Sequence, residues 1–333
     1  MQTRVEELLA GVFGEVPAYS VEPVPFGLTN LTKIIKVNGD KYVARIYDRH
    51  TKDVSSIELE SKITSFLNHS HLSFQVPAFL QAKTGEDCVK FSDGTLGALI
   101  TFLEGSVPEL TATRQAEQLG RIVGELSSAL TKYDTTGLEN RGTPFTHIYR
   151  LHPLADRDAV KRFVEEPPFS IPQEHIAFYH EMIIAIEQDM HLLNLLPRQF
   201  VHHDLLIYNL LAVNNSICGV LDFDLISYDA SFMEFAISLN HVLQMSQGSL
   251  EMAEAFTKGY AGYCKHSSQE IGLLQLMTQI YHAAVLHFYI GQHYSGKNIE
   301  QNFNYILNQF QSRNDWLNTS RPIIREMLES HLL

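Results

Sequence analysis

The stretch VHHDLLIYN, residues 201–209, carries more information about this chain than any other part of its sequence. It places Asp204 five residues before Asn209 and two residues after His202, and the run VLDFD, residues 220–224, supplies two further aspartates. This spacing is typical of sites that transfer the γ-phosphoryl group of ATP. In such sites one carboxylate accepts the proton of the attacking hydroxyl, while an amide and a later carboxylate hold Mg²⁺ against the phosphates.

Local patterns predict how these side chains are presented. The apolar run at 199–201 predicts a short strand that ends at the polar loop. The apolar runs at 210–213 and 217–221 are separated by Asn214-Asn215-Ser216, a connection that favours a β-hairpin. The polar cluster is therefore expected on a loop between a strand and a hairpin.

Such a hairpin would carry Asn209 at its entry and Asp222 at its exit, so that both side chains can converge on one ion. Mg²⁺ takes few protein oxygens and keeps water and phosphate oxygens as its other ligands. Asn209 and Asp222, assisted by Asp224, are therefore the predicted metal ligands. The alternative is a solvated loop with exposed acids, and the complete constellation favours the metal site.

Composition excludes several other classes of protein. The chain has 333 residues, 45% of them hydrophobic and 19% charged, and no apolar run approaches the roughly 20 residues of a membrane span. The N-terminus is acidic and amphipathic, unlike a signal peptide. Cys88, Cys218 and Cys264 are scattered without metal spacing, and their odd number argues against a disulfide framework. We therefore expect a cytoplasmic protein without a membrane partner.

The charge of the chain bears on its partners. The net charge is −13, of which −11 falls after residue 100. Nucleic-acid binding requires a basic face, so a nucleic-acid partner is not expected. An acidic C-terminal region favours a cationic small molecule, although net charge mainly governs solubility. No sequence pattern indicates an oligomeric state.

The order of predicted elements indicates an α+β protein with two lobes. We expect a β-rich nucleotide-binding lobe at residues 1–104 and a mainly helical lobe, with the catalytic loop and substrate pocket, at 105–333. In the first lobe an amphipathic helix and its exit occupy residues 1–20, strands occupy 31–37, 41–47, 76–81, 87–91 and 97–102, and a helix occupies 54–67. In the second lobe helices are expected at 111–130, 173–193, 231–244, 250–263 and 267–294.

Taken together, these motifs resemble those of the aminoglycoside phosphotransferase-like small-molecule kinases, a family that includes type II homoserine kinases, choline kinases and methylthioribose kinases. The resemblance extends from about Phe26 to beyond Ala236 and is carried by residues 26–30, 42–47, 76–77, 119–120, 202–209, 221–224 and 234–236. It implies a bilobal protein-kinase-like fold with ATP and Mg²⁺ as cofactors. The run TFLEG at 101–105 favours a metabolite kinase over an antibiotic-resistance enzyme.

The resemblance also implies roles for the central loop. Asp204 matches the catalytic base, and Asn209 and Asp222 match the Mg²⁺ ligands. His202 belongs to the same catalytic loop, where bracing by hydrogen bonds is favoured over a chemical role. His203 stands where the family usually has Gly, so contact with substrate or phosphate and simple packing are both open.

Further nucleotide contacts are expected from the N-terminal half. Arg45 takes the place of the family's phosphate-contacting Lys, and its expected partner on the following helix is Glu60, with Glu58 as the alternative. An ordinary surface ion pair, worth at most about 1 kcal/mol, is the competing interpretation. A degenerate phosphate loop is expected at Gly27, Thr29 and Asn30, although a tight turn explains this segment equally well. The inter-lobe linker, whose backbone would meet the adenine, is expected at Phe102, Leu103 and Glu104.

Sixteen histidines raise the alternative of a transition-metal hydrolase built on residues 202–204 with His241 or His282, but the spacings match no metal motif. The family builds its acceptor pocket from C-terminal helices, where the candidates are Tyr281, His282, His287, Tyr289 and His293. The leading hypothesis is an ATP- and Mg²⁺-dependent phosphotransferase acting on the hydroxyl of a small metabolite, an amino alcohol or hydroxy amino acid. The alternatives are a nucleotide-binding pseudokinase with a regulatory role, an antibiotic phosphotransferase, and a protein kinase. A protein kinase is disfavoured because the segment between Asp224 and the helix expected to begin near Ser231 is too short for an activation loop.

Overall fold

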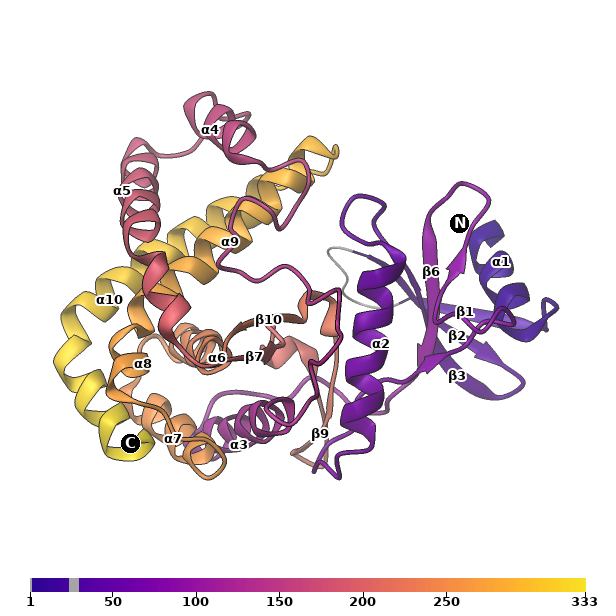
Figure 1. Ribbon diagram of the computed structural model, residues 1–333, viewed down its shortest axis with the longest axis horizontal. Helices are drawn as coiled ribbons and strands as arrows, with labels where there is room; N and C mark the ends of the chain where they lie inside the picture. Colours follow the sequence, from indigo (N-terminus) through magenta and orange to yellow (C-terminus); the bar gives the residue numbers. More distant parts are fainter. Residues whose placement is uncertain (1, 24–29) are drawn as a thin grey trace.

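The computed structural model describes residues 2–23 and 30–333 and has two lobes (Figure 1). The N-terminal lobe is built on a β-sheet, and the C-terminal lobe is mainly helical. The bilobal α+β fold expected from the sequence is therefore confirmed. Gly27 and Thr29, expected in the phosphate loop, lie outside the described residues.

An antiparallel sheet forms the centre of the N-terminal lobe, with the strand order β1-β2-β3-β6-β4 and β5 paired to β6. Its strands are β1 (Tyr19–Pro23), β2 (Leu31–Val37), β3 (Asp40–Ile46), β4 (Phe79–Leu80), β5 (Val89–Lys90) and β6 (Leu96–Thr101). Asn38 and Gly39 join β2 to β3 with φ angles of 53° and 100°, as a type I′ turn requires. Strands β4 and β5 are shorter than expected, because only two residues of each pair with β6.

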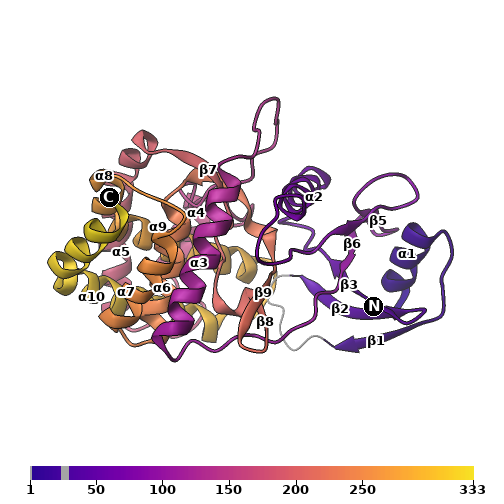
Figure 2. The same ribbon diagram turned by 90° about the horizontal axis from the view of Figure 1, so that it is seen from below.

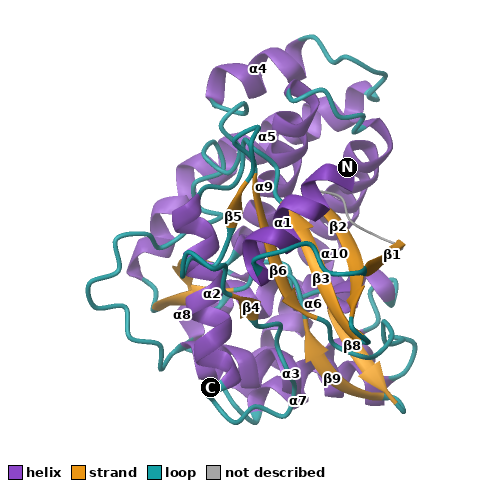
Figure 3. Cartoon of the chain, turned by 90° about the vertical axis from the view of Figure 1, so that its right-hand side faces the viewer, coloured by secondary structure: helices purple, strands orange, loops and turns teal. Residues whose placement is uncertain are grey.

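Helix α1 (Gln2–Phe13) lies across the outward face of this sheet (Figure 3). Leu8 and Leu9 are fully buried there, in one apolar cluster with sheet residues such as Ile35. The helix ends at Gly14, whose φ of 86° is in the left-handed region that glycine adopts without strain. The predicted N-terminal helix is therefore present, and the residues beyond its exit form the edge strand β1.

Helix α2 (Val54–Asn68) lies between the sheet and the helical lobe (Figure 1). It begins with a capping box in which the Asp53 carboxylate accepts a hydrogen bond from Ser56 N at 2.8 Å. Its buried face includes the carboxylate of Glu60 as well as apolar side chains. A buried acid on this helix requires a charged partner, which the functional site supplies.

The helical lobe contains the helices expected from the sequence and two that were not expected. Its helices are α3 (Thr113–Leu130), α4 (Arg157–Glu165), α5 (Gln173–Asp189), α6 (Met233–Met245), α7 (Leu250–Ala261), α8 (Ser268–Gly272), α9 (Leu274–Tyr294) and α10 (Glu300–Leu332), and a 3-10 turn covers Met190–Leu195. The helix expected at 267–294 divides at Leu273 into α8 and α9. Helices α4 and α10 are the unexpected ones.

Four short strands position the central loop. β7 (Arg198–Val201) pairs with β10 (Ser227–Ala230), and β8 (Leu210–Val213) forms a hairpin with β9 (Ser216–Val220). The hairpin turns at Asn214-Asn215, both with positive φ, which confirms the predicted hairpin. Figure 2 shows it where the two lobes meet, and β8 exchanges backbone hydrogen bonds of 2.8 and 3.1 Å with the linker at Ser106.

Candidate active site

The catalytic loop begins where β7 ends and carries Asp204 at its centre. The Asn209 amide nitrogen donates to the Asp204 carboxylate at 2.7 Å and to its backbone carbonyl at 2.8 Å. Burial, together with the negative charge of nearby Asp222, raises the pKa of Asp204 to about 8, although the hydrogen bond from Asn209 lowers it. Asp204 is therefore a carboxylate with an increased proton affinity, as a general base requires.

The hairpin brings Asp222 back to this loop. Leu221 N donates to Asn209 O at 2.8 Å, which fixes the exit of the hairpin beside its entry. Asp222 then adopts φ 64°, a left-handed conformation that is unusual for a non-glycine residue. Its side chain is 44% exposed, so this carboxylate is accessible to solvent. The structure thus brings together the three residues predicted to form the reaction site.

Asn209 and Asp222 are the residues of this loop and hairpin that could hold a divalent metal ion. The amide nitrogen of Asn209 is used by Asp204, which leaves its amide oxygen as a ligand, and Asp222 offers an exposed carboxylate. In the part of the chain that the structure describes, no three His, Cys, Asp or Glu side chains converge on a metal position. An ion held here would therefore complete its shell with phosphate and water oxygens, as Mg²⁺ commonly does.

Arg45 on β3 connects this site to helix α2. Its Nη1 lies 2.5 Å from the Glu60 carboxylate, and its Nη2 lies 2.6 Å from the Asp222 carboxylate. Although burial lowers the pKa of Arg45, the charges of Glu60 and Asp222 raise it well above its ordinary value. Arg45 and Glu60 are buried, whereas Glu58 makes a surface pair with Lys62. The structure therefore pairs Arg45 with Glu60 and not with Glu58.

Asp224 lies beside the same arginine but is enclosed. It is 8% exposed, and Asn30 donates to it at 2.8 Å across the lobes. Lys52 also contacts it, with Nζ 3.1 Å from its Oδ1. Asn30, expected in the phosphate loop, is thus placed against Asp224, while Asp48 N donates to its side-chain oxygen at 3.2 Å. Lys52 was not predicted, because a lysine just before a helix cap is by itself a weak signal.

His202 is completely buried and holds the catalytic loop in place. Its Nε2 lies 2.9 Å from the carbonyl of Leu221, and its Nδ1 accepts a hydrogen bond from Asp204 N at 3.2 Å. Its backbone N donates to the Glu234 carboxylate at 2.6 Å. Burial lowers the pKa of His202 to about 4, so the ring is neutral at pH 7. These contacts match the bracing role, and Glu234 is a buried loop anchor that sequence analysis had noted only as part of a motif.

His203 is also completely buried. It adopts φ 66°, stacks on Phe145 with ring centroids 4.3 Å apart, and places Nε2 3.2 Å from the Asp229 carboxylate. Of the two alternatives, contact with a substrate or packing, the structure places it in packing. The positive φ at position 203 is a conformation that Gly adopts easily. A larger side chain there is strained unless the surrounding structure holds it.

Replacing His203 with Ala is expected to lower the free energy of unfolding by about 1–3 kcal/mol, because buried Asp229 loses its partner. Although burial raises the pKa of Asp229, the hydrogen bond from His203 lowers it below 3.8. The ionised Asp229 therefore stabilises the fold above pH 3.8, and this stabilisation is lost as the pH falls through the lowered pKa of Asp229. The difference in the free energy of unfolding between the variant and wild type should become smaller in acid. Urea unfolding at several pH values measures the free energy of unfolding of both proteins, and His69→Ala, at an exposed position, is the control. Equal stability of the His203 variant and wild type at pH 7 would contradict this assignment.

The five pocket candidates on α9 fall into two groups. Burial, and then the negative charge of Asp204, raise the pKa of both Tyr281 and Tyr289, so the hydroxyl groups of both residues are within electrostatic range of Asp204. His282 stacks on a phenylalanine and His287 lies 2.6 Å from a buried tyrosine hydroxyl, so both belong to the core. His293 contacts the ring of Phe163. Tyr281 and Tyr289 are therefore the two candidates that the charge of Asp204 affects.

The predicted linker crosses between the lobes beside the hairpin. Gly105 has φ 146°, and a Cβ there would lie 2.9 Å from the side chain of Leu211, so only glycine fits this crossing without strain. Lys41 lies over the ring of Phe102 at 4.9 Å and 3.7 Å from the Glu104 carboxylate. The expected adenine-contacting segment therefore lies at the edge of the sheet, next to β8.

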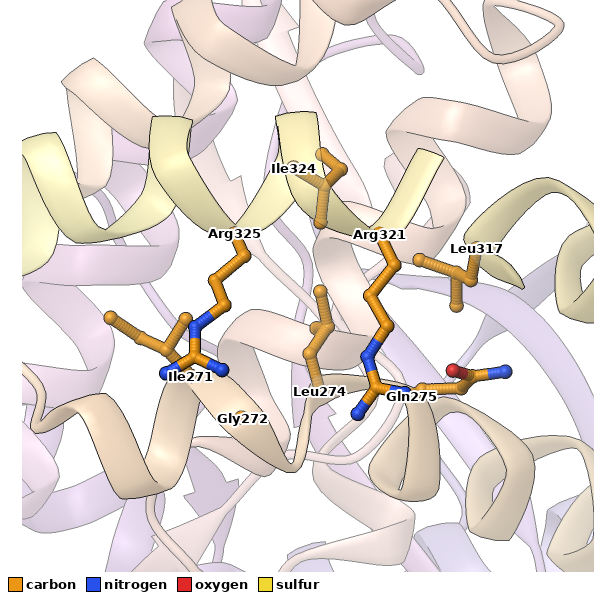
Figure 4. Close-up of a pocket in the computed structure, with 8 residues that line it drawn as sticks. All are labelled: Ile271, Gly272, Leu274, Gln275, Leu317, Arg321, Ile324 and Arg325. Atoms are coloured by element: carbon orange, nitrogen blue, oxygen red, sulfur yellow. The ribbon is translucent and has the colours of Figure 1, made fainter. Parts of the chain in front are cut away.

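A small pocket in the helical lobe does not belong to this site. It lies between α10 and the start of α9 and has a volume of about 30 Å³ (Figure 4). It is lined by Ile271, Gly272, Leu274, Gln275, Leu317, Arg321, Ile324 and Arg325. This space holds about one water molecule and is too small for a metabolite.

A bilobal fold with a catalytic loop and hairpin at the junction is the architecture of kinase-like phosphotransferases. A model described as the phosphotransferase enzyme family matches residues 20–268, so the chain belongs to this family and is a phosphotransferase. The resemblance inferred from the sequence motifs is thereby confirmed. No curated protein sequence matches the chain. No helix in residues 2–23 and 30–333 is long and apolar enough to cross a membrane.

Solved structures share this fold at low sequence identity. A microcompartment-associated aminopropanol kinase matches with a TM-score of 0.73 and 14% identity, covering 98% of this chain and 99% of that chain. Amicoumacin kinase hAmiN, in complex with AMP-PNP, Ca²⁺ and Ami, matches with a TM-score of 0.69 and 14% identity, covering 94% of this chain and 93% of that chain. Choline kinase from Cryptosporidium parvum Iowa II matches with a TM-score of 0.63 and 17% identity, covering 94% of this chain and 93% of that chain. These similarities establish the fold and leave the acceptor to be inferred.

Proposed function

We propose that this chain is an ATP- and Mg²⁺-dependent kinase that phosphorylates the hydroxyl group of a small amino alcohol or hydroxy amino acid. The observation that carries the proposal is the convergence of Asp204, Asn209 and Asp222 at the junction of the lobes. Phosphoryl transfer requires little covalent chemistry from a protein, so positioning and charge supply most of the catalysis. These three side chains, with Arg45 behind them, provide both.

Each side chain would have a separate role in the reaction. Asp204 would accept a hydrogen bond from the acceptor hydroxyl, orient it, and take its proton late in the transfer. Asn209 would hold the Asp204 carboxylate in place, as it does in the structure. Mg²⁺, held by Asn209 and Asp222, would neutralise charge on the phosphates. Arg45 would add a fixed positive charge next to them, supported by Glu60.

The surroundings of Asp204 support an acceptor that carries an ammonium group. The charge of this carboxylate raises the pKa of Tyr281 and Tyr289, so both side chains are within its electrostatic range. Aromatic faces attract cations by about 0.5–2 kcal/mol. The acidic charge of the helical lobe acts in the same direction. Two of the similar structures, an aminopropanol kinase and a choline kinase, are named for acceptors of this class. We also propose a cytoplasmic location, because the three cysteines are free thiols.

ADP release in the presence of Mg·ATP tests this function. The panel should contain 1-amino-2-propanol, ethanolamine, choline, homoserine and an aminoglycoside, with propane-1,2-diol as a neutral match for the first. We expect turnover with an amine-bearing alcohol and none with the diol or after chelation of the metal. Equal turnover with the diol would contradict the cationic acceptor. Nucleotide binding without turnover on any acceptor would favour the regulatory alternative.

A further inference from the structure

Lys52 reaches the metal-binding region from a loop of the N-terminal lobe. It lies between β3 and α2, directly before the helix cap Asp53, and its side chain is 7% exposed. Its Nζ lies 3.1 Å from the Asp224 carboxylate and also donates to the backbone carbonyl of Asp224. A lysine side chain is rarely buried unless its charge is paired, so the ion pair with Asp224 accounts for the burial of Lys52.

The two carboxylates of the hairpin exit are in different environments. Asp222 is 44% exposed, and its Oδ1 lies 2.6 Å from Arg45 Nη2. Asp224 is 8% exposed, and its two oxygens contact Lys52 and Arg45 on one side and Asn30 on the other. The Lys52 ammonium group and the Arg45 guanidinium group therefore place two positive charges beside the Asp224 carboxylate. The exposed Asp222 carboxylate could still take a metal ion beside Arg45, whereas the Asp224 carboxylate is enclosed by Lys52, Arg45 and Asn30.

The charges of the cluster support the same distinction. Arg45 and Lys52 bring two positive charges to the three carboxylates of Glu60, Asp222 and Asp224. Protein kinases hold two Mg²⁺ ions between an Asp, the Asn of the catalytic loop and the phosphates of ATP. Without Lys52 the same carboxylates would leave a larger negative charge for metal ions to neutralise. The ammonium group of Lys52, fixed beside Asp224, neutralises part of this negative charge.

We propose that the ammonium group of Lys52 takes the place of a second divalent ion beside Asp224, so that the nucleotide-bound site holds a single ion through Asp222 and Asn209. This inference rests on the proposed function, because the ion count concerns the complex with ATP. It revises the role expected for Asp224 from metal ligand to partner of Lys52. It makes Lys52 a positioning residue that holds Asp224 and the hairpin exit against the N-terminal lobe.

Counting Mn²⁺ ions by electron paramagnetic resonance tests the inference without depending on turnover. Free Mn²⁺ is titrated into protein saturated with AMP-PNP, and bound ions are counted per chain. We expect one ion for wild type and for Lys62→Met, a matched control that removes an exposed lysine of helix α2. Lys52→Met is expected to bind two ions, because Asp224 is then free to recruit one. The double variant Lys52→Met/Asp224→Asn should return to one.

The outcomes separate this inference from the proposed function. Two ions in wild type would overturn the role of Lys52 while leaving the kinase assignment intact. One ion in folded Lys52→Met, with unchanged affinity, would also overturn it. Failure of wild type to bind AMP-PNP at all would overturn the kinase assignment together with this inference. Circular dichroism of each variant shows whether it is folded, and the wild-type count remains decisive if Lys52→Met does not fold.

Discussion

Replacing Asp204 with Asn is expected to lower kcat by about 10²–10⁴-fold, the range found when a positioned general base is removed. The amide keeps the size of the side chain and can still accept the hydrogen bond that Asn209 donates. It cannot take the proton of the acceptor hydroxyl. The nucleotide KM should stay close to that of wild type, because Asp204 contacts the acceptor and not the phosphates in the proposed complex. Steady-state kinetics with saturating Mg·ATP measure both quantities.

The control for this variant is Asp189→Asn, the same substitution at an exposed position at the end of helix α5. Its kcat and KM should match those of wild type. If Asp204→Asn retains most of the wild-type kcat, the base must be another group and the assigned site is wrong. If kcat and nucleotide binding are both lost, the substitution has disturbed the loop, and unfolding measurements will show it.

Replacing Gly259 with Ala is expected to cost stability at the upper end of about 1–3 kcal/mol, the usual range for overpacking. Helices α3 and α7 cross so closely that a Cβ on Gly259 would lie 2.0 Å from Glu117 O. A Cβ on Gly120 would lie 1.9 Å from Phe256 O, so the contact is reciprocal. Backbone oxygens cannot rotate away as side chains do, and the helices must therefore move apart. A urea titration measures the loss.

Gly272→Ala is the matched control. No heavy atom lies within 4 Å of a Cβ built there, and the position is helical. Alanine should stabilise this helix by up to about 1 kcal/mol, because glycine loses more backbone entropy on folding. Opposite signs for the two substitutions identify the helix crossing as the cause. Equal small effects would mean that α3 and α7 separate at little cost.

The parts of the site that sequence predicted are local in the chain. The loop at 202–209 and the hairpin that returns Asp222 to it are set by short apolar runs and by Asn214-Asn215, which adopt the positive φ of the turn. Arg45 and Glu60 are 15 residues apart, on a strand and the helix that follows it. The family resemblance suggested the pairing of Arg45 with Glu60, and their short separation along the chain allows a strand and the helix that follows it to bring them together.

The parts that sequence did not predict depend on contacts across the lobes. Lys52 meets Asp224 across 172 residues, and Asn30 meets it across 194. Lys52 does not stand out by residue type, because lysine is common in surface loops, and Asn30 was expected in the phosphate loop without a contact to Asp224. The burial of Asp224, and its difference from Asp222, follow only from how the lobes close on one another.

Helix α10 was missed for a different reason. It contains Pro322 and many polar residues, which weaken its intrinsic helix propensity. Its buried residues nevertheless repeat at intervals of three, four and seven, which is the signal that identifies it: Phe303, Leu307, Phe310, Asn314, Leu317, Ile324 and Leu328. Packing of this stripe against α5, α7 and α9 stabilises the helix where propensity does not.

The most direct test of the central claim is detection of the phosphate ester itself. Wild-type protein is incubated with Mg·ATP and the best acceptor from the panel, and the products are followed by ³¹P NMR. The account predicts a new phosphomonoester signal that grows with ADP and is nearly absent with Asp204→Asn. Release of inorganic phosphate without an ester, or ester formation that is unaffected by Asp204→Asn, would contradict it.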